Sequence, residues 1–230
     1  MDFKVLGTIH NTDKISYHGY HRFYPKFLNH LREKEGSLLE IGINMMCSLK
    51  LWLDYFPNFS IYGIDIDFSY KHDRGEVFKC DQSNLNDVIT SLKDINFLFI
   101  IDDGSHVPEH QISCFNYLFD EKLLDGGVYI IEDIETSYWK TGNIYGYKTD
   151  YGYLNKKSCI EVFKTILDSI NSEFLSIENK ILLDSLTSIS SSTRSKISTI
   201  TFGHNCIIIT KKTKEDYIYD NREYRFKEKI

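Results

Sequence analysis

The sequence predicts an α/β fold whose doubly wound, mostly parallel sheet is closed by an antiparallel C-terminal hairpin. Apolar runs of strand length alternate with stretches of helical period along the chain. The runs are apolar almost throughout, which is typical of parallel strands covered by helices on both faces. Two later strands are separated only by a tight turn, so they have to run antiparallel.

Three strands and two helices are predicted in the first half. Residues 37–43 (SLLEIGI) and 60–66 (SIYGIDI) are expected to be buried strands, with a helix over 48–55 between them. A short third strand follows at 76–80. The next helix covers 84–93, because apolar residues recur there at helical spacing, namely Leu85, Val88, Ile89 and Leu92.

The second half continues the same alternation and then ends differently. Strands are expected at 96–101 and 127–131, helices at 110–119 and 156–170, and hairpin strands at 196–202 and 206–211. A parallel sheet closed by such a hairpin is less typical of nicotinamide-binding domains. It is the arrangement of class I S-adenosylmethionine (SAM) methyltransferases, and this remains an analogy of fold.

Neither an internal repeat nor a Pro/Gly linker divides the 230 residues. We therefore predict a single domain over 1–230, with an N-terminal helical segment or lid at 1–36 and a Rossmann-like core at 37–230. The Ser- and Thr-rich stretch 185–198 is expected to be a mobile connection before the hairpin.

Composition limits the compartment and the partners. The formal net charge of −6 argues against a general nucleic-acid binder, which needs a basic surface. The five cysteines are widely spaced without a CxxC pair, so neither a zinc site nor a disulfide scaffold is expected. The first residues lack a signal-peptide pattern, and no apolar run is long enough to span a membrane. We expect a cytoplasmic protein.

Polar residues and a glycine lie at the carboxyl ends of four of the predicted strands, where doubly wound sheets bind ligands. They are Glu40 and Gly42, then Asp65, then Asp81 and Gln82, and finally Asp102 with Asp103. Any one of them is ordinary turn chemistry, but four successive strand ends favour a nucleoside site. The absence of a GxGxxG pattern lowers the expectation of NAD or FAD and leaves SAM as the better candidate.

Two acidic pairs follow neighbouring predicted strands. Asp102 and Asp103 begin the stretch DDGSH, and Glu132 and Asp133 end the stretch IIED. A single acidic pair is most often a solvated turn, whereas two converging pairs repel each other and favour a bound cation. Oxygen ligands suit Mg²⁺, with Mn²⁺ or Ca²⁺ as alternatives. His106, three residues after Asp103, can accept a proton near neutral pH.

At these residues the chain resembles a known family, the metal-dependent sugar O-methyltransferases of the macrocin and mycinamicin type and related bacterial glycan methyltransferases. The matching stretches lie between residues 8 and 140 and include TDK (12–14), LEIG (39–42), YGIDID (62–67), DDGSH (102–106) and IIED with TSYW (130–139). Met46 stands near the position where relatives usually have a glycine.

The resemblance implies a role for each of these groups. It implies that Asp103, Glu132 and Asp133 hold Mg²⁺ (or Mn²⁺), that His106 is the general base, and that the SAM pocket is lined by Glu40, Gly42, Asp65, Asp81, Gln82 and Asp102. The acceptor would be a sugar hydroxyl of a glycan, as in polysaccharide biosynthesis, of a nucleotide sugar or of a glycosylated natural product. Neither a membrane span nor a nucleic-acid partner is expected, and a homo-oligomer is left open.

Acceptor recognition is expected in the aromatic and glycine-rich stretch from Tyr138 and Trp139 to Tyr153, with Tyr145 among its aromatic residues. The alternative interpretation is an ordinary surface loop in a Tyr-rich chain. Residues 12–20 are interpreted as a second lid over the cofactor.

Three other functions stay open at this stage. One is a methyltransferase of catechol or another small vicinal diol, which would use the same metal chemistry. Another is a nicotinamide-dependent reductase, which the missing glycine fingerprint disfavours. The third is a non-catalytic module that binds SAM, a nucleotide or a metal.

Overall fold

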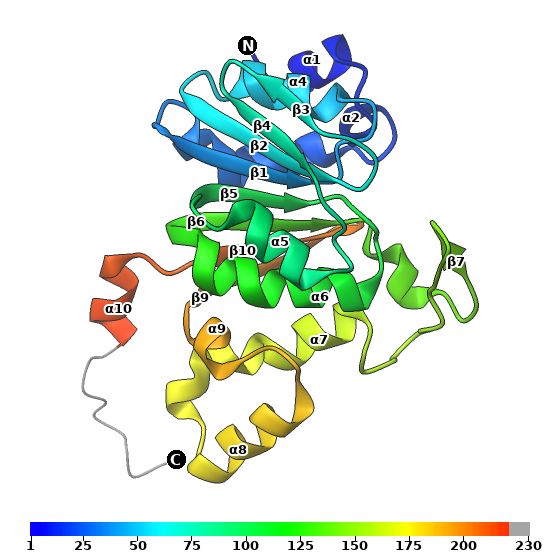
Figure 1. The fold of residues 1–230 in the computed structure, drawn as a ribbon. Coiled ribbons are helices and arrows are strands. Elements are labelled where there is room, and N and C mark those ends of the chain that lie inside the picture. The colour runs from blue at the N-terminus through cyan, green and yellow to red at the C-terminus, as the bar shows by residue number, and fades with distance from the viewer. Residues whose placement is uncertain (221–230) are drawn as a thin grey trace.

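An eight-stranded sheet forms the centre of the computed structural model, which describes residues 1–220 (Figure 1). The strand order is β3-β4-β2-β1-β5-β6-β10-β9. The strands are β1 (Gly36–Ile41), β2 (Phe59–Asp65), β3 (Tyr70–His72), β4 (Gly75–Lys79), β5 (Phe97–Asp102), β6 (Leu123–Glu132), β9 (Ile197–Gly203) and β10 (Cys206–Lys211). The five strands from β4 to β6 are parallel, whereas β10 runs antiparallel to both β6 and β9. The predicted fold class is therefore confirmed.

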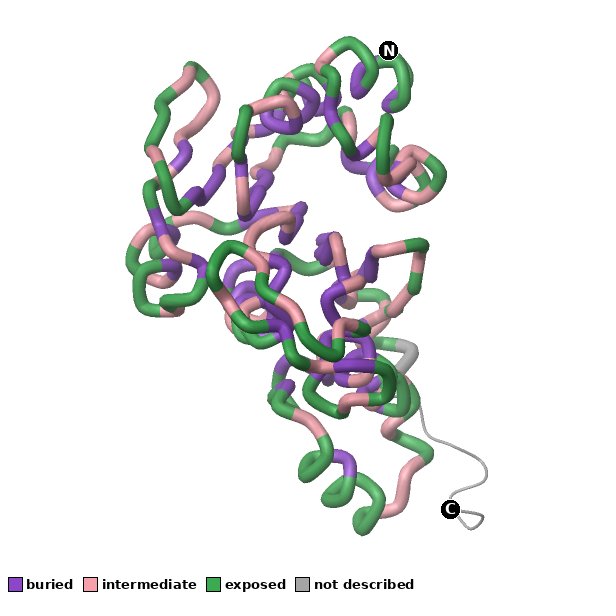
Figure 2. Tube along the Cα trace, turned by 90° about the vertical axis from the view of Figure 1, so that its right-hand side faces the viewer, coloured by how far each residue is buried: buried purple, intermediate pink, exposed green. Residues whose placement is uncertain are grey.

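Helices cover both faces because the strand residues alternate between two cores. Phe99 and Ile101 of β5 pack with α1 (Phe3–Ile9), α3 (Tyr24–Leu28) and α4 (Cys47–Tyr55) on one face. On the other face, Phe97 and Ile100 pack with α5 (Leu85–Leu92), α6 (Pro108–Tyr117) and α7 (Cys159–Thr165). Figure 2, which is coloured by burial, shows buried stretches of the chain in the upper and middle parts of the molecule and mostly exposed ones at its lower end.

Parallel register brings the carboxyl ends of the central strands to one level. Ile41 of β1 pairs with Ile64 of β2 and with Asp102 of β5, and Asp102 in turn pairs with Ile131 of β6. The residues that follow these four strands consequently leave the sheet side by side. This edge of the sheet contains most of the predicted site residues.

Several elements differ from the prediction. The antiparallel edge strand β3 and the small hairpin of β7 (Asn143–Ile144) and β8 (Tyr147–Lys148) are additional, because such short strands have no detectable period. The stretch 185–198, expected to be a connection, contains the end of α8 (Ile177–Leu186) and all of α9 (Ser191–Ser195).

The helix predicted over 156–170 begins only at Cys159, because the Ser158 side chain caps it by accepting a hydrogen bond from the Glu161 amide. Near the end of the described chain lies α10 (Lys214–Asp220), and residues 221–230 of the predicted domain lie outside the described residues. None of the helices within residues 1–220 has the length and apolar character needed to cross a bilayer. The five cysteines are free thiols.

Candidate cofactor and metal site

Gly42 brings the ends of β1 and β5 into close contact. Its φ is +83°, and a Cβ on it would lie 2.2 Å from the carbonyl oxygen of Asp103. Hydrogen bonds fix this approach on both sides, from the Gly42 amide to Ile64 O and from the Asp103 amide to Ile41 O. Only glycine combines this conformation with this contact, so Gly42 is required for the close approach of the Asp103 backbone.

Asp65 at the end of β2 shapes the loop that follows Gly42. Its Oδ2 accepts hydrogen bonds from the amides of Ile43 and Asn44, each at 3.0 Å, and its Oδ1 accepts one from Asp67. Met46 ends this loop with φ 62°, in the left-handed region. That conformation explains the preference for glycine at this place, since an L-residue there is strained by about 1–2 kcal/mol.

A cavity of about 650 Å³ opens along this edge of the sheet. Its volume is in the range of roughly 300–1,000 Å³ that is typical of small-ligand sites. Four residues predicted to bind the cofactor line it, namely Gly42, Asp65, Asp81 and Gln82.

Glu40 and Asp102 do not line the cavity, which corrects the expectation that they contact the cofactor directly. Both are fully buried beneath it. Glu40 accepts a hydrogen bond from the Ser48 hydroxyl, and Asp102 accepts from the side-chain amide of Gln82 with both oxygens at 2.8 Å. Gln82 also accepts a hydrogen bond from the Ser105 amide with its Oε1. Through Gln82, Asp102 therefore supports the stretch that leads to His106. Burial raises the pKa of Asp102 to about 6 and that of Glu40 to about 7.

Asp103, His106 and Asp133 converge at the other end of the cavity. One ligand atom from each lies within 4.8 Å of the others, and all three residues line the cavity. His106 Nε2 lies 3.8 Å from Asp133 Oδ2. The two residues have φ of 56° and 53°, so both turns are held in the left-handed region that aims these side chains inward.

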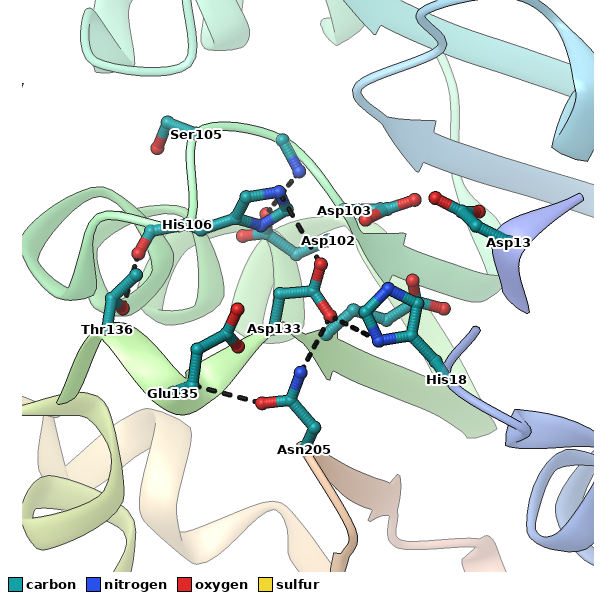
Figure 3. Close-up of polar contacts among 12 residues, drawn as sticks. Asp13, His18, Asp102, Asp103, Ser105, His106, Asp133, Glu135, Thr136 and Asn205 are labelled. Carbon is teal, nitrogen blue, oxygen red and sulfur yellow. Dashed lines mark hydrogen bonds and ion pairs between the residues drawn. The ribbon is translucent and has the colours of Figure 1, made fainter. Parts of the chain in front are cut away.

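Asp133 is positioned by residues from distant parts of the chain (Figure 3). Its Oδ1 accepts hydrogen bonds from the Tyr20 hydroxyl at 2.8 Å and the Asn205 amide at 3.0 Å, and His18 Nδ1 lies 3.2 Å away. Burial raises the pKa of Asp133, while the neighbouring His106 and His18 oppose the rise. The other oxygen, Oδ2, faces His106 and stays available for a cation.

The donor set suits a divalent cation. Carboxylate oxygens are the ligands that Mg²⁺ and Mn²⁺ prefer, and imidazole can complete the set. The Nδ1 atom of His106 is buried without a hydrogen-bond partner among residues 1–220, so the ring has an unused polar atom at this place. Asp103, Asp133 and His106 therefore fit such an ion.

Glu132 lies outside this cluster, and its role as a metal ligand stays a prediction. It is buried, and its Oε2 accepts a hydrogen bond from Lys14 Nζ at 2.8 Å. Its Oε1 accepts a short hydrogen bond from the Tyr24 hydroxyl. Burial and then the charge of Asp103 raise the pKa of Glu132 well above its usual value.

Of Tyr138, Trp139 and Tyr145, which are named as candidates for binding the acceptor, Tyr145 lines the cavity. Its ring centroid lies 6.2 Å from that of His106, and Tyr147 from the same small hairpin lines the cavity as well. Tyr138 is exposed and stacks on Tyr153, while Trp139 packs close to Gly142 within its own loop. Tyr138 and Trp139 thus lie in the loop outside the cavity lining, and their role in acceptor binding stays a prediction.

Sequence reasoning did not single out Lys14, Tyr20, Tyr24 or Asn205 as site residues, and it assigned no function to His18. Four of these lie in the N-terminal segment whose TDK stretch matches the resembling family, so the motif was the one available signal. Asn205 has no such signal, because its role depends on the pairing of β10 with β6.

Comparison with known proteins gives sequence relatives and a structural neighbour. No family model matches the chain. It is 32% identical over 146 residues to the 8-demethyl-8-alpha-L-rhamnosyl tetracenomycin-C 2'-O-methyltransferase of Streptomyces olivaceus, covering 58% of this chain and 38% of that protein. It is 33% identical over 168 residues to the demethylmacrocin O-methyltransferase of Streptomyces fradiae, covering 67% of this chain and 41% of that protein. The chain thus spans about two fifths of the length of these relatives.

One structural neighbour is the MycE methyltransferase of the mycinamycin biosynthetic pathway, solved with Mg, SAH and mycinamycin VI. It superposes with a TM-score of 0.76 at 22% identity, over 98% of this chain and 57% of that chain. The chain therefore has the fold of a class I methyltransferase and is similar in sequence to sugar O-methyltransferases of the macrocin and tetracenomycin type.

Proposed function

We propose that the chain is a SAM- and Mg²⁺-dependent O-methyltransferase that methylates a sugar hydroxyl of a glycosylated natural product. One observation carries this proposal: a single cavity runs from the nucleoside-type residues Asp65 and Asp81 to the cluster of Asp103, His106 and Asp133. A methyl donor at one end and an activated hydroxyl at the other would meet in it. The names of the relatives support the sugar acceptor, and they do not extend the proposal to polysaccharides.

The cofactor would lie beside Gly42, which lines the cavity. Asp65 and Asp81 offer carboxylates to the ribose hydroxyls and the adenine amine. Asp103 and Asp133 would hold the ion, with His106 beside them. A bound Mg²⁺ supplies Lewis-acid stabilisation of the acceptor oxygen.

His106 would act as the general base. Its neutral imidazole would accept the proton of the acceptor hydroxyl, and SAM, when bound, would supply the methyl group that this oxygen takes up. Thr136 holds the turn by donating a hydrogen bond from its hydroxyl to His106 O at 2.7 Å. Base catalysis of this kind contributes about 10²–10⁴-fold to the rate.

Three further expectations rest on the sequence and stay predictions. They are the absence of a nucleic-acid partner, a homo-oligomeric state and a cytoplasmic location.

The test combines activity and binding. The full chain is assayed for methyl transfer from labelled SAM to rhamnosylated and related glycosides and to catechol, with and without EDTA. We expect transfer to the glycoside, its loss in EDTA, and a loss of about 10²–10⁴-fold in His106→Ala with SAM affinity unchanged. His30→Ala, on an exposed residue, is the control.

Other outcomes point to the alternatives. Methylation of catechol in place of the glycoside would indicate a small-diol methyltransferase. Intact SAM binding without any transfer would indicate a binding module, and full activity in excess EDTA would remove the metal from the proposal.

A further inference from the structure

Lys14 is the only lysine of the described chain whose side chain is fully enclosed at the strand-end carboxylates. It lies on the short helix α2 (Asp13–Ser16), and its side chain is 0% exposed. Its Nζ is 2.5 Å from Asp103 Oδ2, 2.8 Å from Glu132 Oε2 and 3.4 Å from Glu40 Oε1. One ammonium group thus contacts carboxylates that follow or end three neighbouring strands.

The surroundings of Lys14 favour its charged form. Its Nζ lies within 3.4 Å of three carboxylates, those of Asp103, Glu132 and Glu40, and hydrogen bonds between an ammonium group and carboxylates are the strong, charge-assisted kind. The ammonium group is therefore a cation among acidic side chains. It offsets part of the negative charge that a divalent ion would otherwise neutralise there.

Glu132 cannot contact Lys14 and a metal ion at the same time. Lys14 engages its Oε2, and the Tyr24 hydroxyl engages its Oε1, so neither oxygen is open to a metal. Asp103 likewise has one oxygen on Lys14, although the residue still belongs to the cluster with His106 and Asp133. A divalent ion that takes Glu132 as a ligand has to displace the ammonium group.

Lys14 is also the anchor of a larger segment, which we call the N-terminal cover (residues 12–24). The rings of His18, Tyr20 and Tyr24 stack in sequence with centroids 5.0 Å apart. Tyr20 reaches Asp133, and Thr12 and Asp13 line the cavity. A displacement of Lys14 would therefore shift the N-terminal cover, including Thr12 and Asp13 in the cavity lining.

We propose that Lys14 is a tethered cation that competes with the divalent metal for Asp103 and Glu132, so that metal binding and release of the N-terminal cover are coupled. The proposal rests on the proposed function for the identity of the ion. Lys14 acts through the carboxylates and is a positioning residue. In the metal-free protein it holds Glu132 and the cover in place, and a bound metal exchanges that contact for its own.

Metal affinity separates competition from mere structural support. Mn²⁺ is titrated into the full chain without cofactor and followed by electron paramagnetic resonance, for the wild type, Lys14→Met and the exposed control Lys26→Met. Lys14→Met should bind Mn²⁺ about tenfold more tightly or better. The ammonium group of Lys14 repels the ion and occupies the same carboxylates, and both effects are large between charges a few ångströms apart. Lys26→Met should match the wild type. Unchanged or weaker binding in Lys14→Met would overturn the proposal.

A second measurement needs no variant and so does not depend on the folding of Lys14→Met. Amide hydrogen exchange of the wild type is compared with and without saturating Mg²⁺. Faster exchange in residues 12–18 on metal addition is expected, and slower exchange there would mean that Lys14 stays in place and the competition is wrong. If neither the wild type nor Lys14→Met binds Mn²⁺ in the titration, both this proposal and the metal part of the proposed function are wrong. Binding without an effect of Lys14 removes this proposal alone.

Discussion

At the scale of single residues, the site is supported from below by buried carboxylates, of which Asp102 is one. Asp102 is fully buried, and its partner is the neutral amide of Gln82 rather than a cation. This explains why burial dominates and raises the pKa of Asp102 to about 6. A carboxylate kept in such surroundings costs stability when it ionises, which suggests that it is retained to orient Gln82 and the stretch toward His106.

The substitution Asp102→Asn tests this cost. Because the folded-state pKa is raised, the stability contributed by Asp102 is full below about pH 4 and is lost as the pH rises through 6. Relative to the wild type, the variant should therefore gain stability between pH 4 and pH 8, by up to about 3 kcal/mol. Urea unfolding across this range measures it, with the exposed Asp94→Asn as control. A difference that does not change with pH would contradict the assignment.

At the scale of elements, the β9–β10 hairpin does more than close the sheet. Its turn places Asn205 at φ 60°, where the side-chain oxygen accepts from the Glu135 amide and the side-chain nitrogen donates to Asp133. Antiparallel pairing of Cys206 with Glu132 brings the turn to this position. The hairpin thus acts as a support for the metal cluster.

Two substitutions at Asn205 separate backbone from side chain. Asn205→Gly keeps the left-handed conformation available and removes the contact to Asp133, whereas Asn205→Ala removes both. Both variants should bind Mn²⁺ several-fold more weakly, and the alanine variant should be less stable than the glycine variant by about 1 kcal/mol. Metal titration and chemical unfolding measure the two effects. Wild-type metal affinity in both variants would show that the turn does not position Asp133.

At the scale of the whole molecule, the cofactor and metal residues are distinct parts of one cavity. Gly42 and Asp81 follow β1 and β4 and Asp65 ends β2, whereas Asp103 and Asp133 follow β5 and β6. Each ligand should therefore bind, and stabilise the fold, without the other.

Thermal unfolding checks this independence. S-adenosylhomocysteine should raise the melting temperature even in EDTA, and Mg²⁺ should raise it without cofactor. Each contributes about 2.7 kcal/mol at a concentration of one hundred times its Kd. Asp133→Asn should remove the Mg²⁺ effect and keep that of S-adenosylhomocysteine. Loss of both effects in this variant would mean that the two sites form only together.

The sequence by itself determined the sheet, most of its helices and the convergence of Asp103, His106 and Asp133. Those features follow from period and from strand ends, which are local properties of the chain. The tertiary structure alone decided that Glu132 pairs with Lys14 and Tyr24, and that Asn205 and Tyr20 hold Asp133. These partners lie 72 to 118 positions apart in the chain. Spacing cannot encode such contacts, because only packing of the N-terminal helices and the hairpin against the sheet brings them together.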